Sequence, residues 1–171
     1  MTAPIRSLST ELDESERWLH ELMDELDLAD ERRALRALRA GLHTIRDRLP
    51  TIEAIELASA LPTLLRGIFY EGWRLPTILR PQHRDQILSA VRARLGRDVA
   101  VDADEVLRAV IRLLERHRRI ELGNVQAALP QPMADLWIES VRPDPTMRAT
   151  SEGPSSRKEN HGQGEPSCDA A

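Results

Sequence analysis

The sequence predicts an all-α protein of two tandem four-helix repeats that pack as one compact helical domain, followed by a disordered C-terminal tail. Three observations support this prediction. Apolar residues recur at helical spacing in successive segments, the order of segments begins again near residue 82, and the apolar pattern stops beyond Val141. Hydrophobic residues make up 41% of the chain, enough for a core, and most are Leu, Ala, Ile and Val. Leu and Ala favour helices.

The first half, residues 11–73, contains four predicted helices. The first starts at Thr10, and the second and third cover about 30–49 and about 52–60. The fourth starts at Pro62 and ends at Gly72. Pro50 ends the second helix, Thr51 is expected to cap the third, and Pro62 suits the first turn of the fourth. Residues 73–82, with two prolines, are interpreted as a linker.

The second half, residues 82–141, repeats this order. Its helices are predicted at about 82–95, 102–118, 121–128 and 130–137, and Gly96 stops the first of them. Leu38-Arg39-Ala40 aligns with Leu107-Arg108-Ala109, Ala60-Leu61-Pro62 aligns with Ala128-Leu129-Pro130, and Phe69 falls on Trp137. The domain therefore spans residues 11–141. Residues 142–171 are rich in Ser, Pro, Gly and Glu, cannot bury enough surface to offset ordering entropy, and are predicted to be disordered.

Composition excludes several classes of protein. The net charge of −4 does not demand a polyanionic partner. A single cysteine, Cys168, cannot form an intramolecular disulfide, which favours a reducing compartment and a cytoplasmic location. No apolar stretch is long enough to span a membrane, and the first residues do not resemble a signal peptide.

The candidate binding site lies in residues 61–73, which hold three of the five aromatic residues. Its proposed members are Arg66, Tyr70, Glu71 and Trp73. Arg66 and Tyr70 are four residues apart on one helix, so guanidinium and ring can touch, and Trp73 could fold back beside them. Such a group is typical of an interaction hot spot. In the alternative interpretation, Phe69 and Trp73 wedge the two halves together while the charged side chains face solvent.

Charge is distributed unevenly along the chain. Residues 11–31 carry ten acidic side chains against Arg17 alone, and residues 32–48 carry six arginines against Asp47. A second basic cluster, containing Arg112 and Arg116, ends the sixth predicted helix. These arginines could bind RNA or a ribosome. Alternatively, the first two helices lie antiparallel with complementary charges, and the second cluster offsets the helix dipole.

No catalytic or metal-binding motif is found. The five histidines lack zinc spacing, no Glu-x-x-His pattern occurs, and no phosphate-binding loop or Gly-x-Ser-x-Gly elbow is present. We therefore predict no catalytic residue, no metal and no cofactor. A ligand-binding enzyme or hydrolase would need a pocket with converging carboxylates or histidines.

The run from Leu38 to Pro50, with Ala60-Leu61-Pro62 and Tyr70-Glu71-Gly72-Trp73, resembles a bacterial family, domain of unknown function family 2267. The resemblance covers about residues 15–140, and the segment ending Leu136-Trp137 resembles the family's second repeat, although Pro132 departs from it. It implies a helical fold and supplies no catalytic residue. The sequence thus favours a non-enzymatic protein-interaction or regulatory module that binds a protein partner or itself, with RNA or ribosome association as the alternative.

Overall fold

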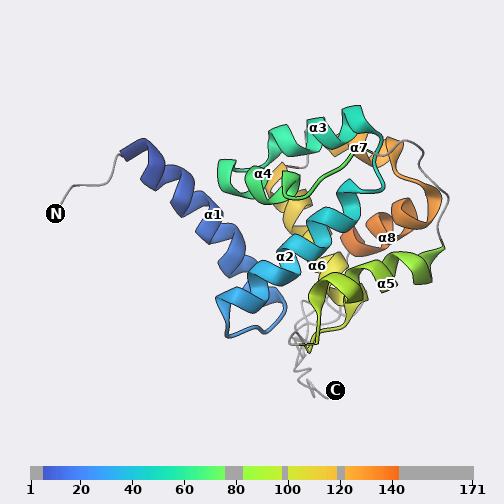
Figure 1. The fold of residues 1–171 in the computed structure, drawn as a ribbon, viewed down its shortest axis with the longest axis horizontal. Coiled ribbons are helices and arrows are strands. Elements are labelled where there is room, and N and C mark those ends of the chain that lie inside the picture. Colours follow the sequence, from blue (N-terminus) through green and yellow to red (C-terminus); the bar gives the residue numbers. More distant parts are fainter. Residues whose placement is uncertain (1–5, 76–82, 98–99, 119–121, 143–171) are drawn as a thin grey trace, which may run out of the picture.

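The computed structural model describes residues 6–75, 83–97, 100–118 and 122–142, and every regular element within them is a helix. The helices are α1 (Arg6–Glu25), α2 (Glu31–Arg46), α3 (Thr51–Ala60), α4 (Thr63–Tyr70), α5 (Arg84–Leu95), α6 (Ala103–Arg118), α7 (Gly123–Ala128) and α8 (Gln131–Val141) (Figure 1). The predicted all-α class is confirmed. The predicted disordered tail lies outside the described residues, except for Arg142 at the end of α8.

The helix ends follow local chemistry. The Asp30 side chain accepts a hydrogen bond of 2.9 Å from the Arg32 N–H and so caps α2. Gly96 ends α5 at a φ of 71°, a conformation that costs glycine little. Several predicted helix ends were wrong by a few residues. The second helix was expected to reach residue 49, but α2 ends at Arg46, and the last was expected to end at residue 137, but α8 continues to Val141. Thr51 is the first residue of α3 rather than its cap, and α1 begins at Arg6 rather than near Thr10.

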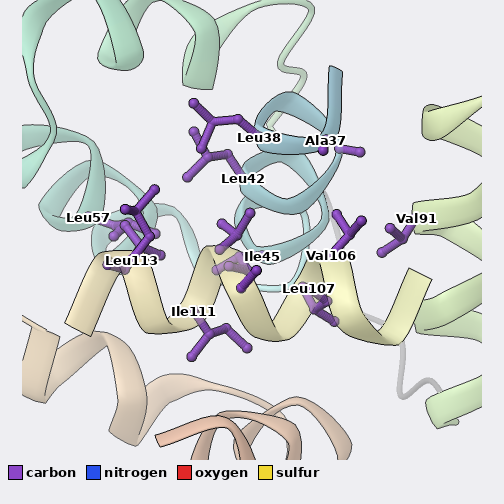
Figure 2. Packing of buried hydrophobic residues seen from close by; sticks show 14 of the residues in the cluster. Ala37, Leu38, Leu42, Ile45, Leu57, Val91, Val106, Leu107, Ile111 and Leu113 are labelled. Atoms are coloured by element: carbon purple, nitrogen blue, oxygen red, sulfur yellow. The ribbon is translucent and has the colours of Figure 1, made fainter. Parts of the chain in front are cut away.

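The core lies between α2 and α6, which cross at the centre of the molecule (Figure 1). Figure 2 shows side chains of both helices gathered at this crossing. The members that it labels on these two helices, all buried, are Ala37, Leu38, Leu42, Ile45, Val106, Leu107, Ile111 and Leu113. Burying each large aliphatic side chain contributes about 1.5–3 kcal/mol, so this pair supplies much of the stabilisation.

The other helices are arranged around this pair in matching ways. α1 contacts α2, α4 and α6, while α5 contacts α6, α8 and α2. α3 contacts α4, α7 contacts α8, and α3 and α7 contact each other. The main contacts of α1 thus correspond to those of α5, and those of α3 to those of α7. The repeat itself, with halves at about 11–73 and 82–141, stays a prediction from the sequence.

Gly41 of α2 lies directly against Val110 of α6. A Cβ atom placed on Gly41 would lie 2.6 Å from Cγ2 and 2.9 Å from Cβ of Val110. Real Cβ atoms do not approach so closely, so any larger residue would push the two central helices apart. Only glycine at residue 41 therefore allows the crossing as it stands.

We predict that Gly41→Ala lowers the free energy of unfolding by about 1–3 kcal/mol, because the added methyl group overpacks the crossing. Gly67→Ala is the matched control, since nothing lies within 4 Å of a Cβ placed on Gly67 of α4. That change should instead stabilise by up to about 1 kcal/mol through helix propensity. Urea denaturation of both variants measures the two effects. Equal effects of the two substitutions would show that the crossing tolerates a side chain.

Candidate interaction surface on α4

Arg66 lies on α4 but binds the end of α3. Its Nε donates to the Ala58 carbonyl at 2.9 Å, and Nη2 donates to the carbonyls of Ser59 and Leu61, both at 3.1 Å. Carbonyls in the last turn of a helix have no partner within the helix, and a cation satisfies them well. Arg66 is therefore directed toward the α3–α4 junction instead of toward Tyr70, contrary to the sequence-based expectation of an Arg66–Tyr70 contact.

Tyr70 and Trp73 form the aromatic part of the site. Their ring centroids are 5.4 Å apart with planes tilted by 33°, and Tyr70 also meets Phe69 edge-on at 5.6 Å. Phe69 is fully buried in the core, Tyr70 is 36% exposed, and Trp73 is half-buried. The aromatic cluster therefore runs from the core to the surface. Phe69 is a core residue, whereas Tyr70 presents a face to solvent.

Glu71 is fixed by α2. Its carboxylate accepts a 2.7 Å hydrogen bond from Arg39 Nε, and its carbonyl accepts one of 3.1 Å from Arg46 Nη1. Arg46 also donates to the Phe69 carbonyl, and His43 Nε2 donates to the Ile68 carbonyl at 2.7 Å. Burial lowers the pKa of His43, so it is neutral at pH 7. The negative end of α4 is therefore closed by side chains of α2.

Sequence reasoning missed these three α2 residues as partners of the site. Arg39, His43 and Arg46 stand at i, i+4 and i+7, which is one face of a helix. The spacing is evident in the sequence. The groups at the end of α4 that these side chains bind could not be foreseen, because α3 and two turns separate α4 from α2. The site is thus built on the rigid surface of α2.

The outer face of α4 carries Leu64, Gly67 and Tyr70, at i, i+3 and i+6. We call these three residues the α4 outer face. Leu64 is 46% exposed, and Gly67 is exposed with open space where a side chain would stand. Leu64 and Gly67 were not among the site residues predicted from the sequence. The spacing of three residues from Leu64 to Gly67 and from Gly67 to Tyr70 is the signal that could have identified them. The face is apolar and interrupted by a bare backbone.

The two ends of α4 differ in charge. At its N-terminal end, Glu11 of α1 lies beside Thr63, whose N–H is 3.4 Å from Glu11 Oε2. The hydrogen bonds with Thr63 are the main reason that the pKa of Glu11 is lowered. A hollow lined in part by Glu11, Glu14 and Arg66 adjoins this end. Beyond the C-terminal end, Arg74 is exposed, and no ion pair is found for it within the described ranges. Glu11 therefore lies beside the N-terminal end of α4, and Arg74 follows its C-terminal end.

The arginines of the second basic cluster hold α1 in place. Arg116 contacts Glu21 at 2.8 Å and Glu25 at 3.2 Å, and Arg112 also pairs with Glu25. His117 binds Glu21 at 2.9 Å. The ring of His117 also stacks on the buried Trp18, with centroids 4.5 Å apart. These acidic residues of α1 were expected to face α2, and that expectation is wrong: they face α6.

Two arginines of the first basic segment are buried: Arg46, the last residue of α2, and Arg48, which follows the helix. Arg48 Nη1 donates to the Thr44 carbonyl at 2.7 Å. Burial, together with the nearby Arg94, lowers the pKa of Arg48 to about 10, which still leaves it charged at pH 7. The arginines proposed for RNA binding thus include many that are engaged inside the molecule.

In the part of the chain that the structure describes, no group of three or more His, Cys, Asp or Glu side chains is placed to hold a metal ion. Within the same residues, no helix is both long enough and apolar enough to cross a bilayer.

Fold and surface together define an all-helical protein whose central helix pair supports a short helix with an exposed apolar face. A family model described as "Uncharacterized conserved protein (DUF2267)" matches residues 15–136, which is most of the chain. The chain therefore belongs to the DUF2267 family, as the resemblance in its sequence implied. No curated protein matches it.

We predict that Arg66→Met lowers the free energy of unfolding by about 1–3 kcal/mol, because the carbonyls at the end of α3 lose a charged donor. The methionine keeps most of the apolar stem, so the change isolates the guanidinium. Arg17→Met, at an exposed position of α1, is the matched control and should have little effect. If Arg66→Met were equally neutral in urea denaturation, the capping role would be contradicted.

We also predict that stability falls in acid because α1 loses its attachment to α6. Burial raises the pKa of Glu21, but hydrogen bonds from Arg116 and His117 lower it by more, and the net shift is downward. A carboxylate with a lowered pKa in the folded state stabilises that state above its unfolded pKa. The contribution is then lost as the pH falls from about 5 to about 3.

The measurement is urea denaturation across this pH range, with Glu21→Gln as the test variant. The variant should be less stable than the wild type at pH 7, and the difference should shrink in acid. A difference that stays constant with pH would contradict the role given to the Glu21 carboxylate.

Proposed function

We propose that this protein is a non-enzymatic interaction module that binds a protein through the α4 outer face, with Trp73 at its edge. The observation that carries the proposal is the open space around Gly67 between two exposed apolar side chains. Of the four predicted site residues, Tyr70 and Trp73 would make contact. Glu71 would border the surface, and Arg66 would hold α4 against α3.

Gly67 has no role inside the described part of the molecule that would require glycine. Glycine within a helix costs about 1 kcal/mol relative to alanine. At Gly41 the packing requires glycine, because Val110 leaves no room for a methyl group. At Gly67 no atom lies within 4 Å of the place that a Cβ atom would take. Gly67 also lacks the positive φ of Gly72 and Gly96. A bare backbone on an exposed helix is therefore best explained by the close approach of another molecule.

The residues on either side of Gly67 suit protein recognition. Leu64 offers an aliphatic surface, and Tyr70 combines a rigid ring with a hydroxyl group. The contact between Tyr70 and the half-buried Trp73 restrains both rings before binding, which reduces the entropy lost on association. Tyrosine and tryptophan are common at the energetic centres of interfaces.

A role in RNA or ribosome binding has less support. It requires arginines of α2 and α6 on one open face, yet Arg46 and Arg48 are buried, and Arg112 and Arg116 bind the acidic side chains of α1. A cytoplasmic location remains part of the proposal, because a chain with one cysteine cannot form an intramolecular disulfide.

Photo-cross-linking in the native host tests the proposed surface. Photoreactive benzoylphenylalanine replaces Tyr70 in one chain and Ile52, which is 70% exposed on α3, in the control chain. We expect a discrete adduct from residue 70 and none from residue 52, with the cross-linked protein identified by mass spectrometry. Adding Gly67→Ala should reduce the adduct about tenfold, because the methyl group keeps the partner away.

Two results would contradict the proposal. One is an adduct pattern that is the same from residues 70 and 52, which would indicate random encounters. The other is an adduct from residue 70 that Gly67→Ala leaves unchanged while circular dichroism shows an intact fold.

A further inference from the structure

We infer that the α4 outer face binds the same face of a second copy of this chain, with the two α4 helices antiparallel and crossing at Gly67. This inference rests on the proposed function and names its partner. It follows from the order of apolar residues along α4 and from the opposite charges at its two ends.

The apolar order is self-complementary. Leu64 and Tyr70 lie three residues before and three residues after Gly67. When two copies of α4 cross antiparallel at Gly67, Leu64 of each copy lies opposite Tyr70 of the other. Both contacts are apolar, and each occurs twice, as in an interface with two-fold symmetry. A parallel arrangement would instead place Leu64 against Leu64 and leave the two tyrosines to face each other.

The crossing requires a small residue where the two backbones meet. Gly67 supplies it in both copies, since its surroundings are open. The molecule already contains an example of this packing, because α2 and α6 approach closely at Gly41. Gly67 differs from Gly41 because, within the described residues, no helix of the same chain packs against the Gly67 side of α4.

The charges select the antiparallel direction. Glu11 lies at the N-terminal end of α4, where its Oε2 is 3.4 Å from the Thr63 N–H, and Arg74 is exposed beyond the C-terminal end. Two other charged groups near α4 have partners within the chain, since Glu71 pairs with Arg39 and Arg66 binds carbonyls of α3. Antiparallel crossing brings Arg74 of each copy toward Glu11 of the other. The helix dipoles are also opposed in this arrangement, which favours it.

Sedimentation equilibrium of the full chain tests the inference, over concentrations from about 1 μM to about 1 mM. We expect a reversible dimer. Gly67→Ala should weaken it about tenfold, and Ile52→Ser on α3 should leave its dissociation constant unchanged. Circular dichroism checks that each variant is folded.

A charge exchange gives the sharpest result. Glu11→Arg alone and Arg74→Glu alone should each weaken the dimer, because each places like charges at both contacts of a two-fold interface. An equal mixture of the two variants should restore association, since the mixed dimer has opposite charges at both contacts. Raising the salt concentration should reduce the difference between the mixture and the single variants.

Three outcomes would overturn the inference: a monomer at every concentration, a dimer insensitive to Gly67→Ala and to the charge variants, or a dimer lost on Ile52→Ser. The proposed function is judged separately. A monomeric protein that still cross-links another protein through residue 70, in a manner sensitive to Gly67→Ala, would retain the interaction module and lose only the self-association.

Discussion

The crossing of α2 and α6 at Gly41 is the constraint on which the rest of the structure depends. These two helices supply the centre of the core, and α1, α4, α5 and α8 each pack on one or both of them. The separation of α2 and α6 is set by Val110, which contacts the Gly41 backbone so closely that no side chain fits. A wider crossing would separate the buried leucines of both helices and move every helix that rests on them.

The arginines mainly organise the ends of the helices. Arg66 satisfies carbonyls at the end of α3, and Arg46 satisfies carbonyls at the end of α4. Arg112 and Arg116 bind the acidic side of α1 to α6. Clustered arginines often bind nucleic acid, yet these guanidinium groups already have partners. The exposed surface of α4 is apolar instead, which is why we propose protein contacts as the function.

Much of the fold could be predicted from the sequence because its determinants are local. Helical spacing of apolar residues gave the eight helices found in the described residues, and Pro62, Pro130 and Gly96 marked ends within a residue or two. The direction of long polar side chains could not be predicted in the same way. The sequence does not show whether Arg66 contacts Tyr70 or the end of α3. In the structure it binds the carbonyls at the end of α3, which have no partner within that helix.

The candidate site was predicted only in part for a similar reason. Tyr70 and Trp73 were identifiable because aromatic residues are rare in this chain. Gly41 and Gly67 look alike in sequence, since each interrupts a helical run. The structure separates them, because one is enclosed by Val110 and the other is open. The functional meaning of Gly67 therefore depends on what lies around it, which no local pattern encodes.

The predicted repeat relates the two residues that meet at the centre of the molecule. Aligning Leu38 with Leu107 places Gly41 on Val110, so the two residues that touch at the centre occupy equivalent positions. Such a contact between equivalent positions is expected when two related halves pack about a local two-fold axis.

The ends of α4 and α8 show the same relationship. Aligning Phe69 with Trp137 places Glu71 on Glu139, and Arg39 likewise corresponds to Arg108. Both glutamates bind these arginines, at 2.7 Å for Arg39 and 2.6 Å for Arg108. The support beneath the helix is thus present in both halves.

The outer faces of the two helices differ. The same alignment places Gly67 on Asp135 and Leu64 on Pro132, while Tyr70 falls on Ile138, which is also exposed, so α8 lacks only the glycine and the leucine. Gln131 donates a hydrogen bond of 2.9 Å to Asp135, which occupies this part of α8 with a local polar contact. A shared scaffold with one altered face is what we expect if α4 alone acquired a partner, because nothing in the common scaffold requires Gly67.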